Sequence, residues 1–312
     1  MHALLTGGGG MLASSIAEAW HRQRPDDRLT VVSRRDVDLA DAEATRVAFA
    51  EIAPDVVIHT AAFVGGIADK IARPLPYLME NVRIDSSVLD AVVGCGIPAY
   101  LYTASAAVYP ANAPNPIGEG ALFTGPLEPA NEGYGLAKLT GLTAVGYAAR
   151  QTDRAYRAIL PSNLYGPRDT FEPGRSHLIA STLLKTHTAR EEARTSVEVW
   201  GDGTARREFT FAPDLAEWIV ASIGELNEWP SVMNVGAGVD HSIREFYEIA
   251  GAVVGFGGEL AFDTSKPSGV PQRLIDSSLA RQHGWAPRTD IRDGMASCYR
   301  SFLARTATGD LR

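Results

Sequence analysis

Short apolar segments alternate with longer segments of mixed polarity through the first half of the chain. Segment 55–59 is almost wholly apolar, as a strand buried on both faces of a parallel sheet should be. Segment 42–52 instead carries an apolar stripe that includes Val47, Ala50 and Ile52 and is typical of a helix. We predict strands at 3–6, 29–33, 55–59, 99–103 and 157–160, and helices at about 11–20, 42–52, 76–93 and from the end of the loop 110–131 to about 151. Strands that alternate with helices imply right-handed βαβ crossovers, so the pattern predicts an α/β fold with a doubly wound parallel sheet.

The regularity changes after Gly166-Pro167, where the segments become shorter and the turn residues more frequent. A helix at about 213–224 and a strand at 233–235 are predicted to rejoin the first sheet. We therefore expect two domains, the second one a smaller α/β domain that is discontinuous in sequence. The predicted division is 1–165 plus about 211–238 for the first domain, and about 166–210 plus 239–312 for the second.

Composition and charge exclude several classes of protein. The 312 residues are 45% hydrophobic and 21% charged, which is ordinary for a globular protein. Lys plus Arg number 29 against 37 for Asp plus Glu, and a net charge of −8 argues against general nucleic-acid binding. Two cysteines, Cys95 and Cys298, are too few for a disulfide scaffold or a cysteine-rich zinc site, and we expect no metal. No apolar run approaches the ~20 residues of a membrane span, and no signal peptide precedes the first strand, so we expect a cytoplasmic protein.

A glycine cluster between the first strand and the first helix is the clearest motif. It has the spacing G-x-x-G-x-x-A through Gly7, Gly10 and Ala13. Glycine lets a pyrophosphate approach the backbone, and the helix N-terminus offers unpaired N–H groups to it. In this strand-turn-helix context we favour a Rossmann-type dinucleotide site over a turn without a ligand. Its predicted contacts are Gly7, Gly9, Gly10 and Met11.

The ends of the second and third strands indicate which dinucleotide is bound. Arg34 and Arg35 follow the second strand, where an acidic residue would bind the ribose of NAD and an arginine suits the 2′-phosphate of NADP. The pair therefore favours NADP, although two solvated arginines would look the same. We expect Asp38 and Leu39 to border the adenine. At the end of the third strand the small Ala61 and Ala62 would let the cofactor lie close.

Tyr134 and Lys138 form the candidate chemical centre. They are four residues apart and so lie on one face of the predicted helix. A nearby ammonium is expected to lower the pKa of the phenol, so Tyr134 can donate a proton to a carbonyl that receives a hydride. Ser105 follows the fourth strand and is placed to hydrogen-bond the carbonyl oxygen. The three residues in this order, after a dinucleotide turn, indicate a reductase.

The chain at this point resembles the extended short-chain dehydrogenase/reductase family, and within it the GDP-L-fucose synthase branch. The resemblance spans nearly the whole sequence, and the Val-Gly-Gly-Ile, Leu-Tyr-Gly-Pro and Arg-Glu-Phe pieces are specific to that branch. The matching stretches are 61–67, 125–129, 131–132, 161–167, 176–177, 200–201, 207–209, 266–267 and 274–276.

The resemblance implies roles for particular residues. Ser105, Tyr134 and Lys138 match the reductase triad of the family. His177 matches one of its two epimerisation residues. The positions that contact the sugar nucleotide in the family are here Asn163, Lys185, Trp200, Arg207 and Arg273. A homodimer is implied as well, since many members of the family dimerise through a four-helix contact.

One departure from the family changes the expected activity. The family's second epimerisation residue is a cysteine, and Ala107 stands in its place. A methyl group cannot move a proton, so we expect NADPH-dependent reduction of the C4 ketone of a nucleotide-activated 4-keto-6-deoxyhexose, without double epimerisation. The alternatives are a bifunctional epimerase/reductase of the GDP-L-fucose synthase type and a non-catalytic NADP-binding regulator. Whether the nucleotide is GDP or dTDP stays open.

Overall fold

The computed structural model describes residues 1–172, 176–266 and 269–308. A six-stranded sheet with the order β2-β1-β3-β4-β5-β9 forms its centre, and every neighbouring pair is parallel. The strand order reverses between β1 and β3, and ligands of open α/β sheets bind at the carboxyl ends of the strands beside such a point. The strands are β1 (His2–Thr6), β2 (Arg28–Val32), β3 (Val56–His59), β4 (Ala99–Thr103), β5 (Ala155–Pro161) and β9 (Val232–Val235).

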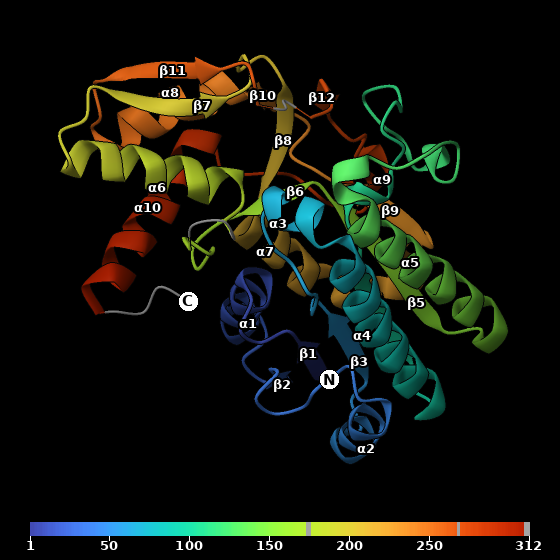
Figure 1. Cartoon of the computed structure of the whole chain (residues 1–312). Coiled ribbons are helices and arrows are strands. Elements are labelled where there is room, and N and C mark those ends of the chain that lie inside the picture. The colour runs from blue at the N-terminus through green and yellow to red at the C-terminus, as the bar shows by residue number, and fades with distance from the viewer. Residues whose placement is uncertain (173–175, 267–268, 309–312) are drawn as a thin grey trace.

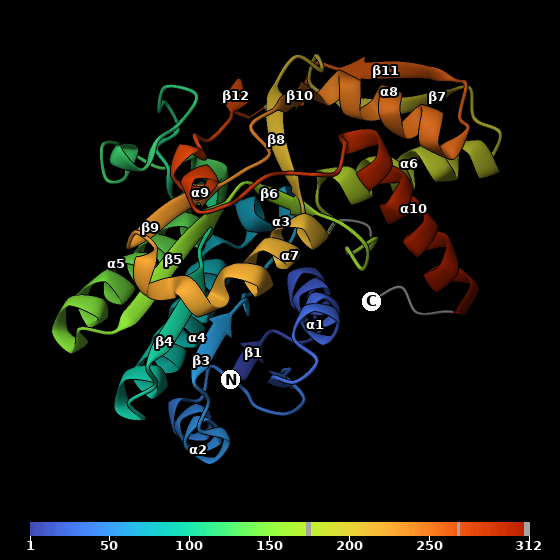
Figure 2. The ribbon, with the colours of Figure 1, turned by 180° about the vertical axis from the view of Figure 1, so that it is seen from behind.

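Helices cover both faces of this sheet (Figures 1 and 2). Successive strand residues point to opposite faces, so Leu5 packs in one core cluster and Leu4 in the other. The first cluster includes Trp20 and Ile219 from the helices on its side, and the second includes Phe49. The first face is covered by α1 (Met11–Gln23) and α7 (Ala212–Ser222), and the second by α2 (Ala42–Ile52), α4 (Pro74–Gly94) and α5 (Glu132–Thr152).

The second region is built around β8, which pairs with β6, β10 and β12. A separate parallel pair joins β7 to β11. Phe209 of β8 and Phe246 of α8 meet edge to face in the core of this region. Its strands are β6 (Asn163–Tyr165), β7 (Ser196–Trp200), β8 (Arg206–Phe211), β10 (Asp240–Ser242), β11 (Glu259–Asp263) and β12 (Gln272–Arg273), and its helices are α6 (Leu178–Glu191), α8 (Ile243–Val254) and α10 (Ile291–Thr308). The short α9 (Ser278–Gln282) instead packs in the first core cluster through Ala280.

The structure confirms the predicted return of the chain to the first sheet. β9 pairs with β5 from Ala158↔Val232 to Pro161↔Val235, and α7 packs beside α1. The sequence analysis did not predict α3 (Ile67–Ala72), α6, α8, α9 or α10. The short α3 has residues that are only half-buried or exposed, and α6 has only a weak apolar stripe. Where residues are described, no helix is both long and apolar enough to cross a membrane.

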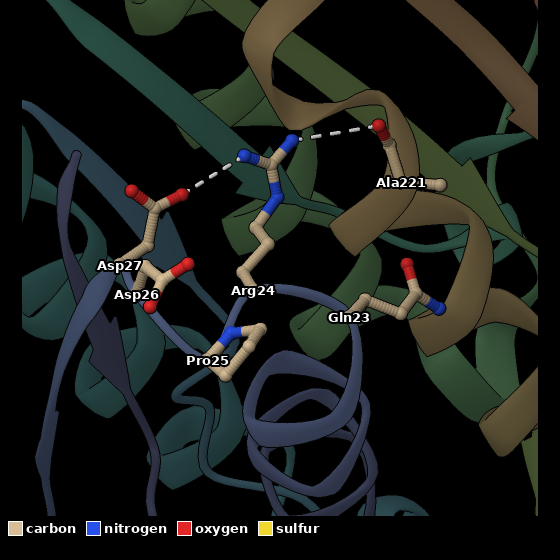
Figure 3. A pocket seen from close by; sticks show the side chains of 6 residues that line it. All are labelled: Gln23, Arg24, Pro25, Asp26, Asp27 and Ala221. Atoms are coloured by element: carbon tan, nitrogen blue, oxygen red, sulfur yellow. Dashed lines mark hydrogen bonds and ion pairs between the residues drawn. The ribbon is translucent and has the colours of Figure 1, made fainter.

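A surface hollow lies at the C-terminal end of α1, near the amino end of β2 (Figure 3). Several of its polar groups already have partners within the protein. Arg24 donates to the Asp27 carboxylate at 3.1 Å and to the main-chain oxygen of Val220 at 2.7 Å. The hollow therefore lies at the end of the sheet opposite the glycine turn. It is lined by Gln23, Arg24, Pro25, Asp26, Asp27 and Ala221.

Candidate active site

The glycine turn after β1 is shaped so that a ligand can approach its backbone. Gly7 has a φ of +82°, and a Cβ there would lie 2.9 Å from the main-chain nitrogen of Ala61, so only glycine fits. A Cβ on Gly9 would meet no atom within 4 Å. Gly10 is the N-cap of α1 and makes no side-chain cap hydrogen bond, which leaves the first N–H groups of the helix, from Met11 onward, for an anion. These residues fit the pyrophosphate of a dinucleotide.

Arg34 and Arg35 lie exposed on the turn that follows β2. The carboxylate of Asp36 accepts hydrogen bonds from the N–H and the hydroxyl of Ser33, at 2.8 and 2.7 Å, and these bonds lower its pKa. Asp36 is thereby tied to the turn it closes. The two guanidinium groups are left on the solvent side, where a 2′-phosphate has room to bind.

The wall beside the glycine turn is made of small and buried residues. Ala62 is half-buried and Leu39 is buried in the core, whereas Asp38 is exposed. The loop that contains Ala62 is held by Asn81 of α4. The Asn81 side chain accepts from the N–H of Phe63 at 2.8 Å and donates to its carbonyl at 3.0 Å. A wall fixed in this way suits the close approach of a flat ligand.

Tyr134 and Lys138 are buried on one face of α5, as predicted, with 9% and 1% of their surface exposed. Ser105 caps the short 3₁₀ turn Ala106–Val108 by accepting from the N–H of Ala107 at 3.2 Å, and its side chain is close enough to Tyr134 to act on the pKa of the phenol. Burial raises the pKa of Tyr134, the charge of Asp85 adds to the rise, and Ser105 works against it. The expectation that Lys138 lowers this pKa is therefore wrong. The phenol is desolvated, and the ammonium is already paired with Asp85.

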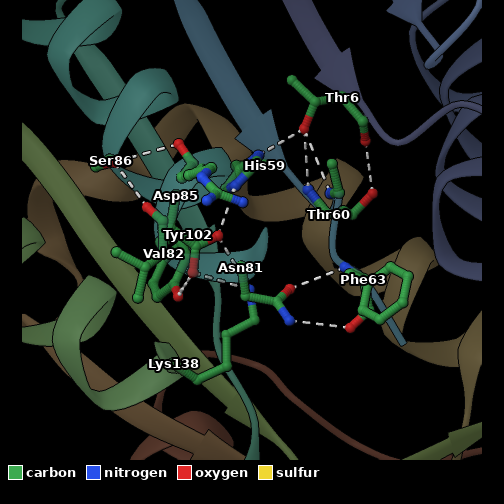
Figure 4. A network of polar contacts seen from close by, with 12 residues as sticks. Thr6, His59, Thr60, Phe63, Asn81, Val82, Asp85, Ser86, Tyr102 and Lys138 are labelled. Carbon is green, nitrogen blue, oxygen red and sulfur yellow. Dashed lines mark hydrogen bonds and ion pairs between the residues drawn. The ribbon is translucent and has the colours of Figure 1, made fainter. Parts of the chain in front are cut away.

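Asp85 of α4 is the centre of a buried polar network that the sequence analysis missed (Figure 4). The ammonium of Lys138 lies 3.2 and 3.3 Å from its two carboxylate oxygens. The hydroxyl of Tyr102 donates to it at 2.5 Å, and Nε2 of His59 lies 3.1 Å away. Nδ1 of His59 lies 2.7 Å from Oγ1 of Thr6, at the end of β1. A continuous chain of contacts thus connects the start of the glycine turn with Lys138.

Lys70 of α3 is a second unpredicted residue beside Tyr134. Its ammonium lies 4.7 Å from the centre of the Tyr134 ring and donates to Oδ1 of Asn131 at 3.2 Å. Burial lowers the pKa of Lys70 to about 8, with Glu128 opposing the change. His177, the N-cap of α6, has its pKa lowered to about 4 by burial and by the charge of Lys70. A cationic amine and a neutral imidazole therefore lie near the reductase tyrosine at neutral pH.

Arg207 and Arg273 lie side by side, because their strands β8 and β12 pair in that register. Arg273 is only 8% exposed, and its Nη1 donates to the carbonyl of Pro110 at 3.0 Å. Its Nη2 is 3.7 Å from the carboxylate of Glu128 and has no hydrogen-bond partner within the described part of the chain. A buried guanidinium with an unused donor is suited to an anion such as a pyrophosphate.

Trp200 lies between two lysines and is 43% exposed. The ammonium of Lys185 is 5.7 Å from the centre of its ring, and that of Lys266 is 5.8 Å away. The structure thus brings the predicted Lys185 and Trp200 together and adds Lys266. Asn163 is exposed, and its amide donates to the main-chain oxygen of Glu208 at 3.1 Å. Its predicted role toward a sugar nucleotide stays a prediction.

Lysine usage is the sequence signal that points to two of the missed residues. Of the 29 basic residues, 25 are arginines and only four are lysines. Lys70 lies over the ring of the reductase tyrosine and Lys138 one helical turn along α5 from it, and the other two, Lys185 and Lys266, lie near the ring of Trp200. Asp85 carried no such signal, since nothing in the sequence distinguishes it from an exposed helix residue.

Comparisons with known proteins agree with this geometry. The model of the NAD dependent epimerase/dehydratase family matches residues 3–236. GDP-L-colitose synthase from Yersinia pseudotuberculosis is 35% identical over 304 residues, covering 97% of this chain and 98% of that protein. GDP-L-fucose synthase from Escherichia coli K12 is 37% identical over 310 residues, covering 96% and 95%. A solved GDP-mannoheptose C4 reductase from Campylobacter jejuni, with NADP bound, matches with a TM-score of 0.85 at 26% identity over 97% of this chain and 98% of that one.

Proposed function

We propose that this chain, which belongs to the NAD dependent epimerase/dehydratase family, reduces the C4 ketone of a GDP-linked 4-keto-6-deoxyhexose with NADPH. The observation that carries the proposal is the buried Tyr134, which lies beside Ser105 and one helical turn from the buried Lys138. Its raised pKa keeps the hydroxyl protonated at neutral pH, as a general acid requires. The related proteins named above act on GDP-linked sugars, so we favour GDP over dTDP.

The residues of the glycine turn would hold the cofactor. Gly7, Gly9, Gly10 and Met11 fit its pyrophosphate, and Arg34 and Arg35 would bind a 2′-phosphate, which favours NADP. We assign Asp38 and Leu39 to the adenine side and Ala61 and Ala62 to the wall under the cofactor. NADPH, when bound, supplies the hydride.

The protein's own groups supply the proton and the orientation. Ser105 holds the ketone oxygen, and Tyr134 donates its proton to that oxygen as the C4 alkoxide forms. Tyr134 then carries the negative charge until it takes a proton from solvent. The ammonium of Lys138, which is paired with Asp85, would contact the ribose next to the nicotinamide.

The second region would bind the sugar nucleotide. Arg207 and Arg273 pair with the pyrophosphate, and Trp200 covers a base or sugar face between Lys185 and Lys266. Asn163 and His177 complete the proposed sugar contacts.

The domain division, the oligomeric state and the location belong to the same proposal. The two predicted domains correspond to the two roles, with the dinucleotide in the first and the sugar nucleotide in the second. Exposed Leu75 and Met79 on α4 and Leu136 on α5 support a homodimer through these two helices. We place the enzyme in the cytoplasm.

Turnover tests the proposal. The purified protein is incubated with NADPH and either the GDP- or the dTDP-linked 4-keto-6-deoxyhexose, and NADPH oxidation is followed at 340 nm. We expect turnover with the GDP-linked substrate and a product reduced at C4 by NMR. Oxidation only with the dTDP-linked substrate would contradict the choice of nucleotide, and none with either would contradict the reaction.

A bifunctional epimerase/reductase is the second candidate, and Lys70 is the observation that favours it. Epimerisation needs one group to remove a carbon-bound proton and another to return one from the opposite face. His177 is neutral at pH 7 and Lys70 is cationic, so the two have pKa values pushed apart as a base and an acid require. We favour reduction alone because Ala107 lacks the family's thiol.

Isotope exchange separates the two candidates. In D₂O without NADPH, a reductase leaves the protons at C3 and C5 of the sugar unexchanged beyond the spontaneous rate. Deuterium at both carbons, lost in Lys70→Met, would support the bifunctional candidate and contradict reduction alone.

A further inference from the structure

Asp85 is a buried carboxylate that donors from three different elements reach. It lies on α4 with 5% of its surface exposed. His59 approaches it from β3, Tyr102 from β4 and Lys138 from α5. The neighbouring Tyr100 of β4 also faces its charge. Because these donors come from β3, β4 and α5, the position of the Asp85 carboxylate is fixed relative to all three elements.

The hydrogen bonds around His59 show which of its two ring nitrogens carries the proton. Burial lowers the pKa of His59, so the ring is neutral and carries one proton. Oγ1 of Thr6 accepts from the N–H groups of Thr60 and Ala61 at 3.3 and 3.5 Å, which leaves its own hydrogen for Nδ1 of His59. The ring proton is then on Nε2 and points to Asp85.

The network contains one anion and one cation. Burial raises the pKa of Asp85, but the charge of Lys138 and the hydrogen bonds from His59 and Tyr102 outweigh it and lower the pKa below its ordinary value. Asp85 is therefore ionised and pairs with the ammonium of Lys138. An ammonium buried to this depth is strongly disfavoured without such a partner.

We propose that Asp85 is a positioning residue for the reduction, which holds the ammonium of Lys138 at one place beside Tyr134. This inference rests on the proposed function. Through His59 and Thr6 the same carboxylate is connected to the main chain of Ala61, next to Gly7.

Asp85→Asn tests the proposal, because it keeps the shape of the side chain and removes the charge. We expect kcat at saturating NADPH to fall by about 10²-fold, which a displacement of a reacting group by about 1 Å can cost, with little change in the KM for the sugar nucleotide. The alkaline limb of the kcat profile should move to lower pH, since the negative charge that raises the pKa of Tyr134 is gone. Asp85→Glu keeps the charge and should return the limb to its original pH. Asp90→Asn, on the exposed side of the same helix, is the matched control and should change neither quantity.

A double variant shows whether Asp85 acts through Lys138. In a Lys138→Met background, the further change Asp85→Asn should leave kcat unchanged, since its target is gone. This pair removes both buried charges, so it keeps the test available if Asp85→Asn alone does not fold. A further drop in kcat in that background would overturn the proposal. An unchanged pH limb in folded Asp85→Asn would do so as well.

NADPH affinity separates this proposal from the proposed function. NADPH binding is measured by fluorescence without any sugar nucleotide. Asp85→Asn should weaken it by about 10-fold, the effect of losing roughly one hydrogen bond. Weakened binding in a protein that turns over no ketone would sink the proposed function and leave the role of Asp85 intact. Unchanged binding in Asp85→Asn would count against Asp85 whatever the substrate.

Discussion

Two glycines of α5 should respond in opposite ways to the same substitution. A Cβ on Gly141 would lie 2.4 Å from the hydroxyl oxygen of Tyr102 and 3.1 Å from a carboxylate oxygen of Asp85. A Cβ on Gly146 would come no closer than 3.7 Å, to the end of the Arg150 side chain. The first position has no room for a methyl group, and the second has ordinary contact distances.

The expected magnitudes follow from these contacts. Alanine in a helix interior is about 0.5–1 kcal/mol more stable than glycine, so Gly146→Ala should raise the free energy of unfolding by that amount. Gly141→Ala has the same gain. Against it, overpacking costs about 1–3 kcal/mol, and the strained hydrogen bond from Tyr102 to an ionised Asp85 roughly 1.5–3 kcal/mol more. We expect Gly141→Ala to lower the free energy of unfolding by about 2–5 kcal/mol.

Urea unfolding followed by circular dichroism measures both variants beside the unmodified protein. A kcat measurement on folded Gly141→Ala should also show a loss, because the Asp85–Lys138 pair is displaced. If Gly141→Ala proves as stable as Gly146→Ala and fully active, the packing of Tyr102 and Asp85 against α5 described here is incorrect.

Three further predictions concern charge. Arg34→Ala/Arg35→Ala should weaken NADPH binding by about 10-fold or more and leave NADH binding unchanged in fluorescence titrations. The factor is taken from the lower end of the free energies of charge-assisted hydrogen bonds, because both arginines are exposed. Equal affinity of the unmodified protein for both cofactors would refute this. Burial raises the pKa of Asp169 from 3.8 to about 7, so its contribution to stability is complete below pH 3.8 and is lost as the pH rises through 7, on the order of 4 kcal/mol in all. Asp169→Asn should therefore flatten the fall in Tm between pH 5 and pH 8, and an equally steep fall would contradict it. Amine methylation with ¹³C labels the four lysines and the N-terminal amine, and the signal absent in Lys70→Arg should titrate near pH 8; a value above 10 would show that Lys70 is solvated.

The sequence predicts the sheet and the reductase residues because both follow from local patterns. Apolar segments of strand length predict β1 to β5. The four-residue spacing of Tyr134 and Lys138 predicts that they share one face of α5, and that face is buried. The return of β9 to the sheet was also predictable from its apolar run.

What sequence reasoning missed depends on contacts between distant segments. Asp85 looks like any helical carboxylate until β3, β4 and α5 converge on it. The pKa of Tyr134 was predicted with the wrong sign for the same reason, since the motif contains Lys138 but not its counter-ion. Lys70 comes to Tyr134 on a helix of only six residues, which is too short to be predicted from periodicity.

Replacing Tyr134 by phenylalanine tests the central claim most directly. The ring and its contact with Lys70 remain, and only the hydroxyl that meets Ser105 is lost. A positioned general acid contributes roughly 10²–10⁴-fold, so kcat for the GDP-linked 4-keto sugar should fall by about that factor, while the Kd for NADPH stays within about three-fold. Turnover near the unmodified rate in Tyr134→Phe would contradict proton donation by Tyr134 and with it the mechanism proposed for this site.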